Sequence, residues 1–458
     1  MNQLSPGHGV ALSSALIACT TFLSQPAGAQ TSIQTAPPAD SSRVTVAAGQ
    51  VARATADSLV RRALQANREL SSARLDLERG RARLRQAGLR PNPTVDIEQS
   101  TGRLTGSPDE RDLSLGFALP IELGARRQRR MDVAEAELAV IEAEVADRER
   151  QLTREVLSAY AGALAALREL QITSNVQGLD EQTLRVVRIR VDARDAPALE
   201  LNLLLTEADR LRSRRALIEG RLEAALITLK HLIGTAASEP LPLDEPLPAL
   251  AAHFGSVPVS VEAAIAIALQ QRPDLRLARL SEAAAQAGLR LARAEAYPDM
   301  TVSGKFTASR TANDLPVPLA PVVQDDRALA FGVSIALPFL NANQGARAEA
   351  AIAIRQAQMR REFVELAVRA EVTRAFRRSE ATRAALAIFE RGVIDRSTDN
   401  IRVIRASYEL GEFRITDLIN EQRRLLDSQR EYAEVLVERY QTLADLQAAI
   451  GTTIGAQP

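Results

Sequence analysis

The eight residues from Ala63 to Leu70 read ALQANREL, and a matching stretch, ALQQRPDL, runs from Ala268 to Leu275. Further landmarks recur in the same order: Pro93 with Pro298, Leu119-Pro120 with Leu337-Pro338, and Ile233-Gly234 with Ile450-Gly451. Chance similarity between alanine-rich helices would not preserve turn residues in a constant order, so the pattern indicates an internal duplication. We predict two structural copies, 54–234 and 258–451, joined by a linker over 235–257.

The composition favours long helices over a globular enzyme. Acidic and basic residues balance at 57 each, and aromatic residues make up 3% with no tryptophan. Large rings dominate most cores and pockets, so their scarcity is unusual for an enzyme. The balanced charge indicates no nucleic-acid partner. The sequence has no phosphate-binding loop, nucleophile motif or metal-ligand cluster. We therefore expect no enzyme activity, no cofactor and no metal site.

The N-terminus has the features of a secretory leader. Residues 10–23 form an apolar run too short to span a bilayer, and Ala27-Gly28-Ala29 fits a small-x-small cleavage site. We predict a signal peptide over 1–29 and a flexible lead-in over 30–53. In an alternative reading, residues 16–19 form a bacterial lipobox and Cys19, the only cysteine, is acylated. No later segment has about twenty consecutive uncharged apolar residues, so we predict no membrane helix.

Each copy has the same order of elements. A helix of about 35 residues, 54–89 or 261–296, ends just before a proline. The period then changes from 3.6 to two, which predicts strand pairs over about 94–121 and 300–339. Apolar side chains alternate there with small or polar ones, notably at Leu113, Leu115, Phe117 and Leu119 and at Leu329, Phe331, Val333 and Ile335. Such alternation over about ten residues is typical of membrane strands, although a soluble hairpin has the same pattern.

A very long helix follows each strand pair. No proline occurs over 121–196 or 339–457, and apolar positions recur every three or four residues. About 67 helical residues would extend roughly 100 Å, which exceeds a globular domain and indicates a coiled-coil shaft. The remaining boundaries are the reversals at 192–197 and 409–412, the helix ends at Gly234 and Gly451, and the tail over 452–458.

Four membrane strands per chain cannot close a barrel. Open sheet edges are not tolerated in lipid, because their backbone groups would stay unpaired. Several chains must therefore share one barrel, and three chains would supply twelve strands, an even number typical of bacterial barrels. The predicted fold is mainly α, with long coiled-coil hairpins that build a hollow α-helical cylinder below a trimeric 12-stranded β-barrel. An object of this kind is a passive conduit.

The stretch from Tyr408 to Asn420, YELGEFRITDLIN, resembles the hairpin-tip segment of the TolC family of outer membrane efflux proteins. The likeness covers essentially the whole mature chain, including its duplication. Two further stretches, LPIELG from Leu119 and LPFLNANQG from Leu337, are similar to the CzcC-like branch, which serves heavy-metal efflux pumps. The second stretch departs from that branch at Ala342, where the branch has arginine.

The resemblance implies a homotrimer in outer membrane lipid. Its periplasmic tips would meet an adaptor (membrane fusion) protein and, through it, an inner-membrane pump of the RND type. The cargo implied by the branch is heavy-metal cations; drugs, or proteins secreted by a type I exporter, are the alternatives within the same fold. The alternative from another class is a periplasmic coiled-coil adaptor or structural protein.

The resemblance also implies a gate near the second reversal. Asp417 matches a position where acidic residues narrow the closed end, and Asn420 matches a second such position without its charge. Three copies of Asp417 around one axis would attract cations. Tyr408 matches a position whose hydroxyl helps to hold the closed state. Without the resemblance, Asp417 would be interpreted as a solvated helix residue and Tyr408 equally as a packing residue.

The two reversals are the predicted adaptor contacts. They comprise Asp195 and Pro197 in the first copy, within 195–199, and Gly411, Glu412 and Arg414 in the second, within 411–415. The simpler interpretation is that both segments only reverse the chain.

Overall fold

The computed structural model of the chain describes residues 54–102, 110–243, 245–254, 257–313 and 322–452. Residues 52–458 form one compact unit. The predicted signal peptide, the predicted lead-in and Cys19 lie outside the described residues, as do residues 453–458 of the predicted tail. No helix in the described part combines the length and apolar character needed to cross a lipid bilayer.

Each span that was expected to hold one helix holds two. α1 (Ala56–Ala66) and α2 (Arg68–Ala87) meet at Asn67, and α5 (Val261–Gln271) and α6 (Pro273–Ala294) meet at Arg272. Both corner residues have an extended backbone. Asn67 accepts a hydrogen bond from the Leu70 amide and so caps α2, while Pro273 occupies the first position of α6, where a missing N–H costs nothing. The prediction of an unbroken helix was therefore wrong in both copies.

The four strands form one antiparallel sheet in chain order, which is β1 (Thr94–Thr101), β2 (Arg111–Ile121), β3 (Met300–Asn313) and β4 (Val322–Ile335). The register sets Leu115 opposite Ile97 on one side and Phe306 on the other, and Phe306 opposite Leu329. Directly opposed residues point to the same face of a sheet. The predicted alternation is thus confirmed, since the apolar side chains gather on one face.

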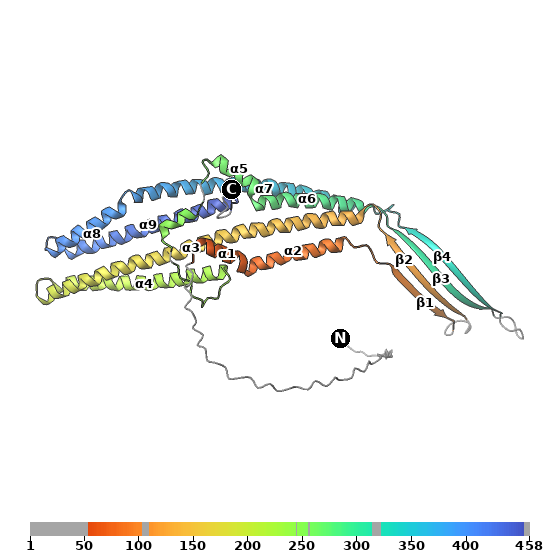
Figure 1. Cartoon of the computed structure of the whole chain (residues 1–458), viewed down its shortest axis with the longest axis horizontal. Helices are drawn as coiled ribbons and strands as arrows, with labels where there is room; N and C mark the ends of the chain where they lie inside the picture. Colours follow the sequence, from red (N-terminus) through yellow and green to blue (C-terminus); the bar gives the residue numbers. More distant parts are fainter. Residues whose placement is uncertain (1–53, 103–109, 244, 255–256, 314–321, 453–458) are drawn as a thin grey trace, which may run out of the picture. The chain divides into compact units, whose positions relative to one another are not determined.

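The long helices differ between the copies. α3 (Arg126–Asp192) runs for 67 residues without interruption, as predicted, and α4 (Ala198–Leu232) returns beside it. The second copy has α7 (Gln344–Glu390), a break, α8 (Val393–Glu409) and the returning α9 (Ile415–Ile450). The break falls at Gly392, whose φ of +105° only glycine adopts readily. The predicted unbroken second shaft was wrong, and α8 departs from the line of α7 (Figure 1).

Each strand is continued by one helix. α2 leads into β1, α3 follows β2, α6 leads into β3 and α7 follows β4 (Figure 1). Beside the sheet, α3 contacts α2 and α6, and α6 contacts α7. The helices therefore keep the order of the strands, with α2 and α7 at the two edges.

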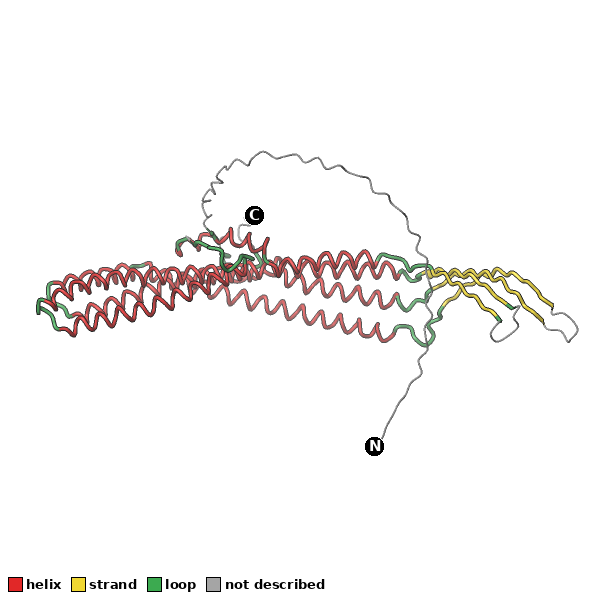
Figure 2. Tube along the Cα trace, turned by 90° about the horizontal axis from the view of Figure 1, so that it is seen from below, coloured by secondary structure: helices red, strands yellow, loops and turns green. Residues whose placement is uncertain are grey.

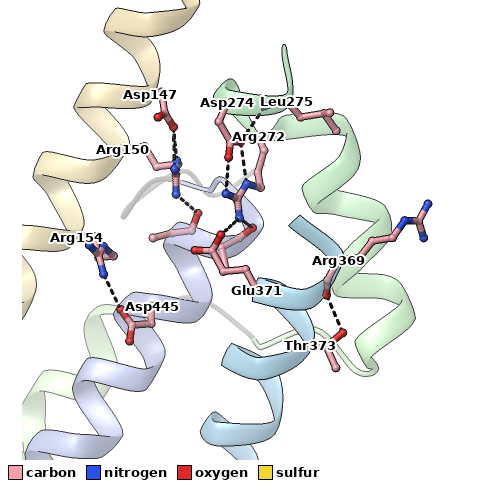
Figure 3. A network of polar contacts seen from close by, with 12 residues as sticks. Asp147, Arg150, Arg154, Arg272, Asp274, Leu275, Arg369, Glu371, Thr373 and Asp445 are labelled. Atoms are coloured by element: carbon pink, nitrogen blue, oxygen red, sulfur yellow. Dashed lines mark hydrogen bonds and ion pairs between the residues drawn. The ribbon is translucent and has the colours of Figure 1, made fainter. Parts of the chain in front are cut away.

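The C-terminal end of α9 lies about midway along the helices (Figure 1), where polar contacts join it to helices of both copies (Figure 3). The buried Arg272 guanidinium lies between the carboxylates of Asp274 and Glu371, and its Nη1 also donates to the Ala449 carbonyl at 3.1 Å. Arg150 from α3 donates to the neighbouring Ala448 carbonyl at 2.9 Å. These cations satisfy carbonyls that the end of a helix leaves unpaired.

The first copy has the same arrangement with a different corner residue. The Asn67 side-chain amide donates to the Leu232 carbonyl at 2.9 Å, at the end of α4. Gly234 and Gly451 follow the two helix ends with φ of +69° and +84°. A Cβ on Gly234 would lie 2.4 Å from the Ala66 carbonyl oxygen, so the close approach requires glycine there.

Candidate functional site

The two chain reversals lie at the same end of the helices, away from the sheet (Figures 1 and 2). One buried apolar cluster joins them, with Val187 and Leu204 from the first copy and Ile401, Tyr408 and Leu418 from the second. The reversals of the two copies therefore belong to one site, which we call the tip.

Tyr408 ties the two hairpins together at the tip. Its side chain is buried, and its hydroxyl donates to Glu200 Oε2 at 3.0 Å. The Arg190 guanidinium lies 5.3 Å from the centre of the ring. Burial, together with the bond to Glu200, raises the pKa of Tyr408 to about 12. The phenol is therefore protonated at neutral pH and donates to the first turn of α4.

Near the tip, further polar contacts cross between the copies. Arg405 of α8 donates to Gln182 of α3 at 3.3 Å. Arg423 of α9 binds Glu207 of α4 with two bonds, Nε to Oε1 at 3.0 Å and Nη2 to Oε2 at 2.5 Å. The bond from Arg423 lowers the pKa of Glu207. Together with Tyr408, these contacts link α8 and α9 to both helices of the first hairpin.

Sequence reasoning missed Gln182, Glu200 and Arg405. Their partners lie more than 200 residues away in the chain, so no local pattern could reveal the pairs. The duplication places both reversals at one end, but it does not give the register between the hairpins.

Asp417 has a defined structural role. Its Oδ2 accepts a hydrogen bond from the Arg414 amide at 3.1 Å, so it completes the cap at the start of α9. A carboxylate in the first turn is also favoured by the helix dipole. Asn420 is exposed one turn further along. The narrowing role of Asp417 and Asn420 stays a prediction.

The predicted adaptor contacts are all exposed, namely Asp195, Pro197, Gly411, Glu412 and Arg414. Pro197 directly precedes α4, and Gly411 has a φ of +79° that makes the second reversal possible. Exposed apolar side chains that were not predicted lie beside them: Leu199 at 65%, Leu410 at 76% and Phe413 at 44% exposure. An apolar patch on an exposed turn is typical of a protein contact site.

A buried carboxylate lies further up the same helices. Asp180 of α3 is 1% exposed, and neither of its carboxylate oxygens has a well-aligned hydrogen-bond partner. The side chain of Gln422 on α9, equally buried, lies close enough to lower its pKa slightly, but burial and the charge of Glu207 on α4 outweigh this. Their net effect raises the pKa of Asp180 to about 6. Asp180 therefore titrates just below neutral pH where three helices pack.

No metal centre is present in the described part of the chain, since no three His, Cys, Asp or Glu side chains come together there as ligands would. The tip and the Asp180 region hold charge pairs and buried polar groups between helices. Charge pairs of this kind hold helices together when they are formed and allow the helices to separate when they are broken.

The sequence profile of a family described as "Outer membrane efflux protein" matches residues 59–235 and 264–452. The pyoverdine export outer membrane protein OpmQ of Pseudomonas aeruginosa is 28% identical over 270 residues, which are 55% of this chain and 56% of OpmQ. The chain thus aligns with about half the length of this curated relative.

Two solved channels have the same fold. CusC superposes with a TM-score of 0.73 at 20% identity, over 88% of this chain and 93% of CusC. The open state of the MtrE outer membrane channel of Neisseria gonorrhoeae superposes with a TM-score of 0.69 at 22% identity, over 87% of this chain and 89% of MtrE. The two profile matches coincide with the two copies that the duplicated sequence predicts.

Proposed function

Because the chain belongs to the outer membrane efflux protein family, we propose that it is the outer-membrane duct of a three-part efflux system, a passive exit channel and not an enzyme. One observation carries this proposal beyond family membership. At both lateral edges of the described unit, the edge strand has no partner strand and the edge helix exposes apolar side chains.

The edges of the sheet are unpaired. β1 and β4 are the outer strands of the described sheet, so each has one row of backbone N–H and C=O groups without a partner strand. These groups would be costly in hydrocarbon, where no water can bind them. Pairing β4 of one copy with β1 of the next satisfies both rows.

The helices at the same edges carry exposed apolar residues at heptad spacing. α2 exposes Leu75 at 62%, and Ala82, seven residues later on the same helix, is also exposed. α7 exposes Ile352, Met359 and Leu366 at 56%, 63% and 67%. Residues seven apart lie on one stripe of a helix, as at a coiled-coil seam. Each edge strand is therefore continued by an edge helix with its own unburied seam.

Two different edges favour head-to-tail association, which closes into a ring when the rotation between copies is right. Three copies would supply twelve strands and a cylinder of helices, in agreement with the homotrimer that the sequence predicts. The outward apolar face of the sheet would then contact lipid.

The tip is the proposed gate and adaptor site. The Tyr408–Glu200 and Arg405–Gln182 contacts hold the second hairpin against the first, which would favour a closed end. Asp417 and Asn420 would narrow it. The exposed residues of both reversals, Asp195, Pro197, Gly411, Glu412 and Arg414, would meet a periplasmic adaptor that is coupled to an inner-membrane RND-type pump.

Two cargo classes have support. Heavy-metal cations are supported by the likeness of the stretches from Leu119 and Leu337 to the CzcC-like branch. A secreted small organic molecule is supported by the likeness to OpmQ, a pyoverdine exporter. Deleting the gene and measuring growth with added Co²⁺, Zn²⁺ or Cd²⁺ separates them, because only the first proposal expects increased metal sensitivity.

The assembly is tested with the edge seam of α7. The triple variant Ile352→Glu, Met359→Glu and Leu366→Glu should fail to form trimers, because ionised carboxylates would be buried between copies. The matched control, Ile352→Leu, Met359→Leu and Leu366→Ile, should still assemble. The readout is the mass of the detergent-solubilised protein from outer membranes. A wild-type chain that is monomeric, or that leaves membranes without detergent, would overturn the proposal.

A further inference from the structure

Four exposed arginines lie at the end of α2 and in the segment after it, immediately before the sheet. Arg81, Arg83, Arg85 and Arg90 fall within ten residues, and no acidic residue occurs between Glu78 and Asp96. All four are exposed, and none of their guanidinium groups has a hydrogen bond or ion pair in the part of the chain that the structure describes. We call these four residues the α2 arginine cluster. Their charges are unbalanced locally.

The contrast with α3 makes this cluster unusual. The start of α3 also has four arginines beside the sheet, but each is engaged within the chain. Arg126 binds Asp299 at 2.6 Å, Arg127 donates to the Gly88 carbonyl, Arg129 binds Asp132 at 2.9 Å, and Arg130 binds Glu122. The arginines of α3 therefore hold the junction together, and those of α2 are not needed for that purpose.

The cluster is held in place at the junction. Arg127 donates to the Gly88 carbonyl and Arg130 to the Leu89 carbonyl at 3.3 Å, so the segment that carries Arg90 is fixed against α3. Pro91 and Pro93 then restrict the chain before β1 begins at Thr94. The positive charge thus lies at a fixed level, a few residues from the first strand.

Exposed apolar side chains lie at the same junction between the helices and the sheet. Leu89 is 57% exposed between Arg85 and Arg90, and the segment between β4 and α7 exposes Phe339 at 86% and Leu340 at 94%. Large apolar groups beside unpaired cations are typical of the boundary between acyl chains and headgroups, where the rings and aliphatic groups enter the lipid and the cations meet phosphate.

We propose that the α2 arginine cluster binds the phosphate groups of anionic phospholipids in the periplasmic leaflet of the outer membrane. The inference rests on the proposed function, which places the sheet in the membrane and α2 beside α7 of the next copy. Guanidinium groups bind phosphate with two parallel hydrogen bonds, and basic residues beside a membrane are attracted to anionic headgroups.

A neighbouring copy is the competing partner for this charge, and it offers too few carboxylates. In the proposed ring, α2 lies beside α7 of the next copy. The segment from 336 to 346 has no charged residue, and the first turns of α7 hold Arg347 and Glu349, whose charges cancel. One glutamate cannot balance four arginines, whereas a lipid surface can.

The test uses the full-length protein purified in a non-ionic detergent. Native mass spectrometry measures binding of dioleoyl phosphatidylglycerol and of dioleoyl phosphatidylcholine, which differ in headgroup charge. A basic residue near an anionic surface changes affinity about fivefold. The quadruple change of Arg81, Arg83, Arg85 and Arg90 to Gln should therefore weaken phosphatidylglycerol binding at least tenfold and leave phosphatidylcholine binding unchanged.

Three further measurements decide the proposal. The matched control changes four exposed arginines elsewhere, Arg185, Arg188, Arg374 and Arg383, to Gln, and it should retain wild-type selectivity. Lysine at the four cluster positions should also retain it, since the charge is kept. If the Gln variant does not fold, the wild type decides, because raising NaCl should reduce its preference for phosphatidylglycerol.

Equal binding of the two lipids by the wild type would overturn the proposal, as would undiminished selectivity in the Gln variant or its loss in the control. These outcomes are distinct from failure of the proposed function. Membrane fractionation and the mass of the trimer test the proposed function, whereas lipid selectivity is measured on the purified chain.

Discussion

Replacing Asp180 with asparagine should strengthen the packing of α9 against α3 at neutral pH. The carboxylate is 1% exposed, lacks a well-aligned hydrogen-bond partner and lies near the charge of Glu207. Asparagine has the same shape without the charge, and its amide can pair with Gln422. The change thus removes the cost of burying an ion and leaves the volume of the core as it was.

The magnitude follows from the raised pKa. With a pKa of 3.8 in the unfolded chain and about 6 in the folded one, the ionised group costs the folded state about 3 kcal/mol above pH 6. Asp180 binds its proton more tightly in the folded chain than in the unfolded chain, so at this site acid stabilises the folded state. The cost is absent below pH 3.8, grows between 3.8 and 6, and is complete above 6.

The assay is hydrogen exchange of the backbone amides of α9 in the purified chain at pH 4.5, 6 and 7.5, corrected for intrinsic rates. The variant should protect the turns around Gln422 about tenfold or more over wild type at pH 7.5, and the difference should shrink towards pH 4.5. Glu207 acts in the opposite sense, since Arg423 lowers its pKa and its pairing is lost in acid. Comparing variant with wild type cancels that contribution.

Asp192→Asn is the matched control, because it removes an exposed carboxylate from the same helix. It should leave α9 exchange unchanged at all three pH values. A difference between Asp180→Asn and wild type that does not vary with pH would refute the reasoning, as would faster exchange in the variant at pH 7.5.

Three further changes test other contacts. Tyr408→Phe removes the bond to Glu200 and should loosen the tip by about 1 kcal/mol, seen as faster exchange at the start of α4; unchanged exchange there would contradict this role. Arg272→Ala leaves Asp274 and Glu371 without their cation and should cost about 3 kcal/mol, seen as a lower thermal midpoint, with Arg272→Lys less affected. Gly392→Ala forces an L-residue to a φ of +105° and should cost about 1–2 kcal/mol, measured by thermal unfolding. The control is Gly288→Ala inside α6, where an added Cβ would enter open space.

The fold could be predicted from the sequence largely because the sequence contains an internal duplication. The repeat at Ala63 and Ala268 located both copies, and the alternation from Leu113 to Leu119 placed apolar side chains on the face where they lie. Both signals are local. The shaft of 67 residues followed from a long proline-free stretch with helical periodicity.

The failures have equally local causes. Asn67 and Arg272 end one helix and begin another within a single residue, so the periodic pattern continues across the corner and hides it. The break at Gly392 was not foreseen, because a glycine within a proline-free periodic stretch does not by itself end a helix. Contacts such as Tyr408 with Glu200 depend on how two hairpins align, and that alignment is set by packing over the whole length of the helices.

The interruption at Gly392 makes the two halves of a duplicated chain mechanically unequal. One hairpin is built on a continuous rod, and the other has a joint some eighteen residues before its reversal. A closed ring of three copies would contain six hairpins, in which three continuous and three jointed hairpins alternate around the axis. Swinging the three jointed hairpins outward would widen the aperture and swinging them inward would narrow it, while the three continuous hairpins keep the circumference constant.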